Sequence, residues 1–318
     1  MDNTTTTHST SSTYSITLLL LRVLTFIFLV MALIFISINK LTFDEIDAEI
    51  KFHDVYAYRY MLSTIVIGFA YNLLQMGFSI FTVVSGKRVL SSNGGYLFDF
   101  FGDKIIAYLL ISGSAAGLGF TVELLQHIPS DSFTQKANVS ASLLLVGNPE
   151  ALDMVNTPPS SSTVSRTVLL LLRVLIFVFL LIALILIAIV KQTDDETGAE
   201  IKFNDIYAYR YMISTIIIGF AYNLLQMAFS MFTVVSGNRV LSGDGGYLFD
   251  FFGDKIISYL LISGSAAGFG VTVELGRGVP SNSFIEKANA SASLLLIGFL
   301  LTAIASTFTS FALPKKAN

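Results

Sequence analysis

Cysteine is absent from the 318-residue chain, and histidine occurs only three times. Without cysteine the chain cannot form disulfides, thiolate metal sites, a catalytic thiol or an S-palmitoyl anchor. The histidines lie in polar tails or loops, so imidazole-based metal or acid–base chemistry has little material. The sequence also lacks a P-loop and the HExxH, GxSxG and dinucleotide-binding motifs. We therefore expect no enzymatic activity, no metal site and no cofactor.

Charged residues are scarce as well, at 13% of the chain, and 19 basic residues nearly balance 22 acidic ones. This balance excludes the basic surface that a nucleic-acid partner would require. Hydrophobic residues make up 53% of the chain, and the mean hydropathy is +0.72. A soluble core and a solvated surface cannot use so many apolar side chains. The composition therefore predicts a protein embedded in a lipid bilayer.

The sequence repeats itself over most of its length. The motif LLLLRVL occurs at Leu18–Leu24 and again at Leu169–Leu175, and YAYRYM occurs at Tyr56–Met61 and again at Tyr207–Met212. Both pairs are separated by the same offset of 151 residues, and about three-quarters of the aligned positions are identical. The chain is therefore a tandem duplication of one unit.

Each unit contains apolar runs long enough to cross a membrane. A helix needs about 20 residues to span ~30 Å of hydrocarbon, and backbone in lipid must satisfy its own hydrogen bonds. The sequence therefore predicts an all-α membrane protein of tandem four-helix transmembrane bundles. We expect a first unit at residues 1–150 with helices at about 16–38, 61–84 and 103–125, a junction at 151–166, and a second, complete unit at 167–318 with helices at about 168–190, 212–235, 254–275 and 292–313.

The fourth helix of the first unit is truncated. Its apolar run of about ten residues ends at Asn148-Pro149-Glu150, too short to span a bilayer. About seven transmembrane helices result, and this odd number of crossings conflicts with two similar units that require the same orientation. The segment from Met154 is similar to the Ser/Thr-rich start of the first unit, which favours two neighbouring duplicated genes joined in one reading frame. The alternative is a seven-span protein with one helix on the membrane surface.

Basic residues in the loops predict the orientation. Lys87, Arg88 and Arg239 lie between the second and third helices of their units, and Lys315 and Lys316 lie in the C-terminal tail. These segments are expected in the cytoplasm, and the more acidic loop between the first two helices is expected outside. Both termini of a four-span unit would then be cytoplasmic.

Two charges inside the apolar runs are candidate functional residues. Arg22 lies within the first helix, where an arginine costs about 2.5–3.5 kcal/mol near the bilayer centre. Asp103 begins the third helix, which runs in the same direction and places the carboxylate at a similar depth. We predict an intramembrane ion pair between them, repeated by Arg173 and Asp254 in the second unit. The alternative is that Arg22 is an anchor whose guanidinium reaches the cytoplasmic interface.

Small residues in the third helix of each unit predict close helix packing. Gly113 and Gly117 have GxxxG spacing, and so do Gly264 and Gly268. Glycines at this spacing let two helix backbones approach closely, where lipid provides no hydrophobic force for association. This spacing is equally consistent with packing inside one bundle and with contact between molecules.

Two amides share one face of the second helix in each unit. Asn72 and Gln75 are three residues apart, as are Asn223 and Gln226. Such amides can hydrogen-bond to neighbouring helices. A path for ions would need more polar groups, so we expect these amides to hold helices together.

These features together resemble the plant Casparian strip membrane protein-like family, in its 4D-type branch. The resemblance rests on the arginine of LLLLRVL and on the aspartate of FGDKIIAYLLISGSAAG, which fall on Arg22, Asp103, Arg173 and Asp254. It implies a four-helix fold related to MARVEL-type proteins, a plasma-membrane location and homo- and hetero-oligomers. Founding members form scaffolds that recruit peroxidases and other wall-building machinery. The first outer loop here lacks their ESLPFFTQF-like stretch, and the second lacks their cysteines, so Casparian strip formation itself is not implied.

The sequence thus favours a non-enzymatic plasma-membrane scaffold. We expect its partners to be the lipid bilayer, other copies of itself, related proteins and cell-wall enzymes. The alternative function, from another class, is a small channel or transporter. A scaffold predicts slow lateral diffusion and stable co-purification with relatives, whereas a channel predicts a conductance that depends on Asn72 or Asp103.

Overall fold

The computed structural model describes residues 6–38, 40–43, 48–85, 93–126, 132–147, 166–193, 200–236, 244–278 and 283–311. Within these ranges, the fold consists mainly of long helices, and a short β-hairpin joins the first two helices of each unit. The first unit contains α1 (Thr6–Ser37), β1 (Lys40–Phe43), β2 (Ala48–Lys51), η1 (Phe52–Asp54), α2 (Tyr56–Ser85), α3 (Asn93–Leu124) and α4 (Ser132–Val146).

The second unit repeats this order with one difference in length. Its fourth helix has 29 residues, whereas α4 has only 15. Its elements are α5 (Arg166–Ala188), β3 (Lys191–Thr193), β4 (Glu200–Lys202), η3 (Phe203–Asp205), α6 (Tyr207–Ser236), α7 (Asp244–Gly278) and α8 (Ser283–Phe311).

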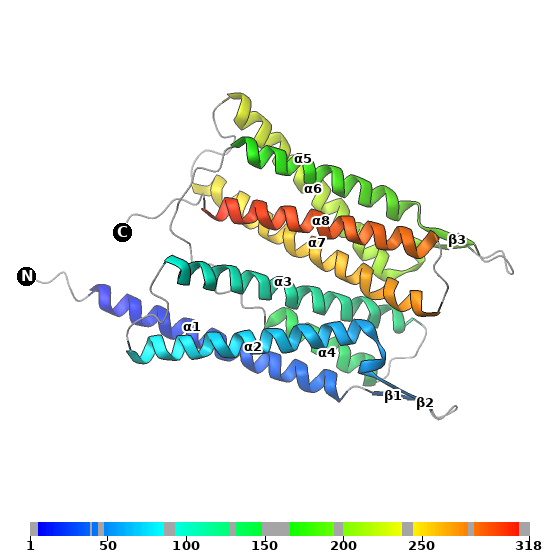
Figure 1. The fold of residues 1–318 in the computed structure, drawn as a ribbon, viewed down its shortest axis with the longest axis horizontal. Coiled ribbons are helices and arrows are strands. Elements are labelled where there is room, and N and C mark those ends of the chain that lie inside the picture. Colours follow the sequence, from blue (N-terminus) through cyan, green and yellow to red (C-terminus); the bar gives the residue numbers. More distant parts are fainter. Residues whose placement is uncertain are drawn as a thin grey trace, which may run out of the picture.

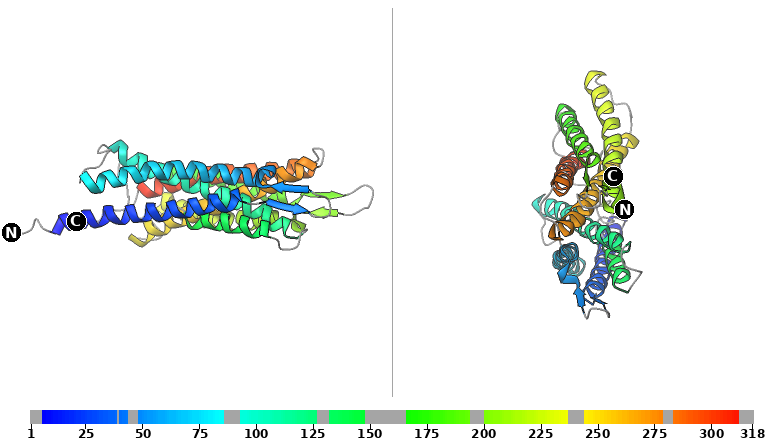
Figure 2. Two further views of the ribbon diagram at one scale, coloured as in Figure 1. Left: turned by 90° about the horizontal axis from the view of Figure 1, so that it is seen from below. Right: turned by 90° about the vertical axis from the view of Figure 1, so that its right-hand side faces the viewer.

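The two units lie side by side with the same orientation (Figure 1). The β1–β2 and β3–β4 hairpins extend from the same end of the molecule, and α1 begins and α8 ends at the opposite end. Viewed along the helices, the two bundles are neighbours, and α3 packs against α7 between them (Figure 2). The helices of both units could therefore cross one membrane in parallel.

Seven of the described helices are long and apolar enough to span a membrane, which confirms the predicted all-α membrane fold. The helix that falls short is α4. It ends beside Gly147, where an added Cβ would lie 2.9 Å from the Cβ of Phe28, near the middle of the apolar span Ile16–Ser37 of α1. Despite the odd number of spans, α5 runs in the same direction as α1 (Figure 1). The junction predicted at 151–166, including Met154, lies outside the described residues except for Arg166.

Several helix starts were predicted too late in the chain. The second helix begins at Tyr56 rather than at 61, and the third begins at Asn93 rather than at 103; α6 and α7 repeat both differences. The length of an apolar run shows which residues cross the hydrocarbon core. A helix can begin before that run, because its polar residues can form hydrogen bonds at the membrane interface. The hairpins were not predicted either. They pair Lys40 with Lys51 and Lys191 with Lys202.

Each unit has its own apolar core between its helices. In the first unit Leu29, Tyr58 and Leu144 are fully buried within one cluster, and Leu180, Tyr209 and Leu295 occupy the matching places in the second. Small polar residues join the fourth helix to the first. Ser140 donates a hydrogen bond to the carbonyl of Ala32 at 2.8 Å, and Ser291 donates to that of Ala183 at 2.7 Å. Such bonds fix helix contacts inside a membrane.

Candidate functional site

Arg22 on α1 and Asp103 on α3 meet inside the first bundle. Nη1 of Arg22 lies 3.3 Å from Oδ1 of Asp103, and Nη2 lies 3.2 Å from Oδ2, so the guanidinium binds the carboxylate with two parallel contacts. The side chains are 4% and 0% exposed. Two opposite charges of this geometry neutralise each other where lipid could solvate neither. The arginine therefore does not extend to the interface as a simple anchor.

The second unit contains the same pair, formed with closer contacts. Nη2 of Arg173 lies 2.7 Å from Oδ2 of Asp254 and 2.7 Å from Oδ1. An additional donor comes from α8, because the hydroxyl of Thr309 lies 3.4 Å from Oδ2 of Asp254. Residue 309 belongs to the part of the fourth helix that α4 lacks. The two pairs thus share their charges, and they differ in the guanidinium contacts and in one hydroxyl.

A tyrosine on the second helix completes each site. Tyr71 donates its hydroxyl to Oδ1 of Asp103 at 2.9 Å, and Tyr222 donates to Oδ1 of Asp254 at 2.9 Å. The phenol approaches the third helix over a glycine. A Cβ at Gly102 would lie 2.9 Å from Cζ of Tyr71, which is too close for a real side chain. Glycine at this position therefore allows the tyrosine to reach the aspartate.

Both predicted amides of the second helix belong to this site. Asn72 donates Nδ2 to the backbone carbonyl of Arg22 at 3.0 Å and so ties α2 to α1. Gln75 donates Nε2 to the hydroxyl of Tyr71 at 2.8 Å and to Oδ1 of Asp99 at 3.1 Å. In the second unit, Asn223 donates to the carbonyl of Arg173 at 2.8 Å, and Gln226 donates to Tyr222 and Asp250 at 2.9 and 3.1 Å.

Sequence reasoning missed three members of the site in the first unit: Tyr71, Asp99 and Gly102. Spacing was the available signal. Tyr71 precedes Gln75 by four residues, and Asp99 precedes Asp103 by four, so each pair shares a helix face. Six polar side chains from α1, α2 and α3 therefore form one hydrogen-bonded network per unit, here called the charge network: Arg22, Tyr71, Asn72, Gln75, Asp99 and Asp103, and in the second unit Arg173, Tyr222, Asn223, Gln226, Asp250 and Asp254.

The four GxxxG glycines lie against the second helix of their own unit. A Cβ at Gly113 would collide with Thr64, and one at Gly117 would lie 2.6 Å from the sulfur of Met61. In the second unit Gly264 faces Thr215 and Gly268 faces Met212 in the same way. Of the two interpretations that the spacing left open, the structure places these glycines in packing inside the bundle.

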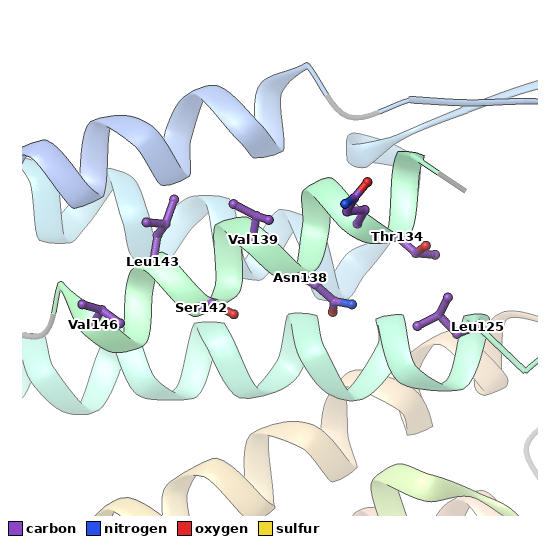
Figure 3. A pocket seen from close by; sticks show the side chains of 8 residues that line it. Leu125, Thr134, Asn138, Val139, Ser142, Leu143 and Val146 are labelled. Atoms are coloured by element: carbon purple, nitrogen blue, oxygen red, sulfur yellow. The ribbon is translucent and has the colours of Figure 1, made fainter. Parts of the chain in front are cut away.

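The charge network joins α1, α2 and α3 of its unit through hydrogen bonds. It brings a cation and two carboxylates together, but no group of three or more metal-ligating side chains occurs in the parts of the chain that the structure describes. A surface pocket of about 480 Å³ lies elsewhere, along α4 and the end of α3 (Figure 3). Its lining is uncharged and includes Leu125, Asn138 and Val146. This pocket offers polar hydroxyl and amide groups but no acid or base.

The sequence of both units matches one known family. The model for the Casparian strip membrane protein domain matches residues 11–147 and again residues 162–301. The chain belongs to this family. It carries the family domain twice, which agrees with the tandem duplication in the sequence.

Named relatives of the family have the length of one unit. CASP-like protein 4D1 of Glycine max is 90% identical over 168 residues, which are 53% of this chain and 99% of the relative. CASP-like protein 4D1 of Ricinus communis is 50% identical over 50% of this chain and 98% of the relative. CASP-like protein 4D2 of Arabidopsis thaliana is 44% identical over 51% and 99%. The chain is thus similar to the 4D members. No solved structure matches it.

Proposed function

We propose that this chain is a non-enzymatic, multi-pass scaffold of the plasma membrane that associates laterally and organises a membrane domain. The observation that carries the proposal is the packing of two units side by side in one orientation, through α3 and α7. Units of this fold can thus associate in the plane of a membrane through their helices. Membership of the Casparian strip membrane protein family supports the same function.

The proposed partners are other copies of the chain, related family members and cell-wall-modifying enzymes. Large apolar side chains such as Leu20, Ile67 and Leu171 are at least half exposed on the helices, which suits contact with lipid tails or with further helices. The hairpins extend from one end of both bundles, where they could meet partners outside the cell. With the hairpins outside the cell, both ends of a four-span unit lie in the cytoplasm. The basic residues that support it, Lys87, Arg88, Arg239, Lys315 and Lys316, lie outside the described residues.

Lateral diffusion tests the scaffold directly. The full-length chain, labelled with a fluorescent protein, is expected to recover slowly after photobleaching in the plasma membrane and to co-purify with single-unit relatives. A single-pass membrane protein of similar expression level serves as the freely diffusing control. Recovery as fast as this control would contradict the scaffold. A conductance in reconstituted bilayers that disappears in Asn72→Leu or Asp103→Asn would favour the alternative, a small channel.

The joined-gene interpretation has its own test. Transcript sequencing across Gly147–Met154 distinguishes one message that carries both units from two separate messages. Abundant full-length message would support a single seven-span polypeptide. Its absence would assign the scaffold function to two separate single-unit proteins.

A further inference from the structure

The contact between the two units is reciprocal at its centre. A Cβ added at Gly119 of α3 would lie 3.1 Å from the Cβ of Ala267 on α7, and one added at Gly270 of α7 would lie 3.3 Å from the Cβ of Ala116 on α3. Gly270 and Ala267 are the repeats of Gly119 and Ala116 at the offset of 151. Each unit thus offers the same glycine to the same alanine of the other, which brings the two helix backbones close together.

The outer end of this contact is reciprocal too. Glu123, near the end of α3, accepts a hydrogen bond from the backbone nitrogen of Tyr207 at 2.9 Å, and Glu274 on α7 accepts one from that of Tyr56. Tyr56 and Tyr207 begin α2 and α6, where the first backbone N–H groups of a helix have no partner in their own helix. Each carboxylate therefore caps a helix of the other unit and also interacts favourably with its dipole.

The second unit contributes one charged contact that the first unit does not. Arg277 donates to the backbone carbonyl of Asp54 in the first unit, lies 3.3 Å from Glu274, and stacks over the Tyr56 ring at 4.6 Å. The repeated position in the first unit is Gln126, which carries no charge. The interface is thus two-fold in its plan, with one extra charged contact on one side.

Contacts of this kind are the mark of an isologous interface, in which residue i of one partner meets residue j of the other, and j meets i. Such a surface is complementary to itself and needs no covalent link. We infer that the α3–α7 face is a dimerisation surface whose partner is a second unit of the same kind, and that the duplication has joined both halves of this dimer in one chain. The inference rests on the lateral association proposed above and names its surface.

The inner end of the interface shows what a complete partner adds. Tyr108 on α3 contacts Phe299 of α8 with ring centroids 4.9 Å apart, and Lys104 donates to the hydroxyl of Ser306 at 3.4 Å. Both α8 residues lie in the half of the fourth helix that α4 lacks. A dimer of two complete units would form these contacts twice. Among the residues that the structure describes, the joined dimer forms them on one side only.

Cleavage of the full-length chain tests the inference. A protease site inserted between residues 148 and 165 allows the junction to be cut after purification in mild detergent. We expect the two halves to co-purify after cleavage. In the double variant Gly119→Leu, Gly270→Leu they should separate, with at least a tenfold loss of the co-purified half, because each leucine would push the facing backbone away. Gly77→Leu is the matched control, because a Cβ there meets nothing within 4 Å.

An engineered crosslink gives a second measurement that does not depend on the leucine variants folding. Because the chain has no cysteine, Gly119→Cys with Ala267→Cys introduces a single thiol pair. Their Cβ atoms would lie 3.1 Å apart. A disulfide needs a Cβ–Cβ distance of about 3.5–4.5 Å, so a small separation of the two helices is enough to form the bond. Oxidation should keep the cleaved halves together on a non-reducing gel, whereas Gly77→Cys with Ala267→Cys should not.

The outcomes separate this inference from the scaffold proposal. Wild-type halves that part on cleavage, or a thiol pair that does not crosslink, would overturn the dimerisation surface whatever the diffusion measurements show. Halves that stay together and crosslink would support the surface even in a chain that recovers quickly after photobleaching.

Discussion

The two units are nearly the same in sequence, yet one has a fourth helix of 29 residues and the other a fourth helix of 15. The charge network hardly differs between them. In both units the arginine, tyrosine and aspartate come from the first three helices, and the tyrosine hydroxyl lies 2.9 Å from the carboxylate. Three helices are therefore sufficient to build the network, and the fourth is not needed to position any of its six members.

The longer helix changes how the second aspartate is surrounded. Asp254 accepts from Arg173, Tyr222 and Thr309, whereas Asp103 accepts from Arg22 and Tyr71. A carboxylate with three donors depends less on any one of them. The comparison therefore teaches that the same ion pair should be more sensitive to substitution in the unit with the shorter helix.

Loss of the arginine should have the largest effect on stability, and the effect should differ between the two units. Arg22→Ala and Arg173→Ala each leave a buried aspartate without its cation, which costs about 3–5 kcal/mol of stability. We expect Arg22→Ala to cost more, by about 1 kcal/mol, because Asp254 retains one more hydrogen bond than Asp103. Thermal unfolding in detergent, followed by far-ultraviolet circular dichroism, measures both.

Controls for the arginine variants come from the same chain. Arg59→Ala and Arg210→Ala remove arginines that are exposed at the starts of α2 and α6, and should change stability little. The charge swap Arg22→Asp with Asp103→Arg should recover part of the loss. Equal costs for the two buried arginines would contradict the compensating hydroxyl, and a swap without any recovery would contradict the ion pair.

The tyrosines should show the same inequality between the units on a smaller scale. Tyr71→Phe and Tyr222→Phe each remove one hydroxyl bound to a buried carboxylate, and hydrogen bonds to charged groups contribute about 1.5–3 kcal/mol. The two oxygen–oxygen distances are the same, but Asp254 keeps the hydroxyl of Thr309, so we expect Tyr71→Phe to lose more stability. Tyr207→Phe, at an exposed ring, is the control. Equal losses would show that the Thr309 hydroxyl does not compensate for the missing phenol.

Much of this arrangement could be predicted from the sequence, and the reason is physical. Lipid permits few charges, so an arginine and an aspartate at matching depth have few alternatives to each other. The same reasoning does not find Tyr71, because a tyrosine in an apolar helix is ordinary and only the glycine at position 102 lets it reach Asp103. An ion pair between the few charged side chains in a membrane can be predicted from the sequence. A hydrogen bond that forms only because two helix backbones approach closely can be found only in the structure.

Contacts between the units were harder to predict for another reason. Glu123 lies at the end of its helix, where a carboxylate is expected to be solvated, and its partner is the backbone nitrogen of Tyr207 in the other unit. A backbone group has no signature in the sequence. The GxxxG spacing gave the stronger signal for helix contact, yet Gly113 and Gly117 pack inside the bundle, and Gly119 faces the other unit.

Thr309→Val should have the smallest effect and gives the sharpest test of the comparison. It removes a hydroxyl 3.4 Å from Asp254 that also donates to the carbonyl of Ser306 at 3.1 Å, so the loss should be about 1 kcal/mol or less. Its value lies in combination with Arg173→Ala. Without either donor Asp254 resembles Asp103 after loss of Arg22, so the double variant should be as unstable as Arg22→Ala. A double variant no less stable than Arg173→Ala alone would mean that the hydroxyl does not support the buried charge, and that the longer fourth helix does not stabilise the ion pair of the second unit.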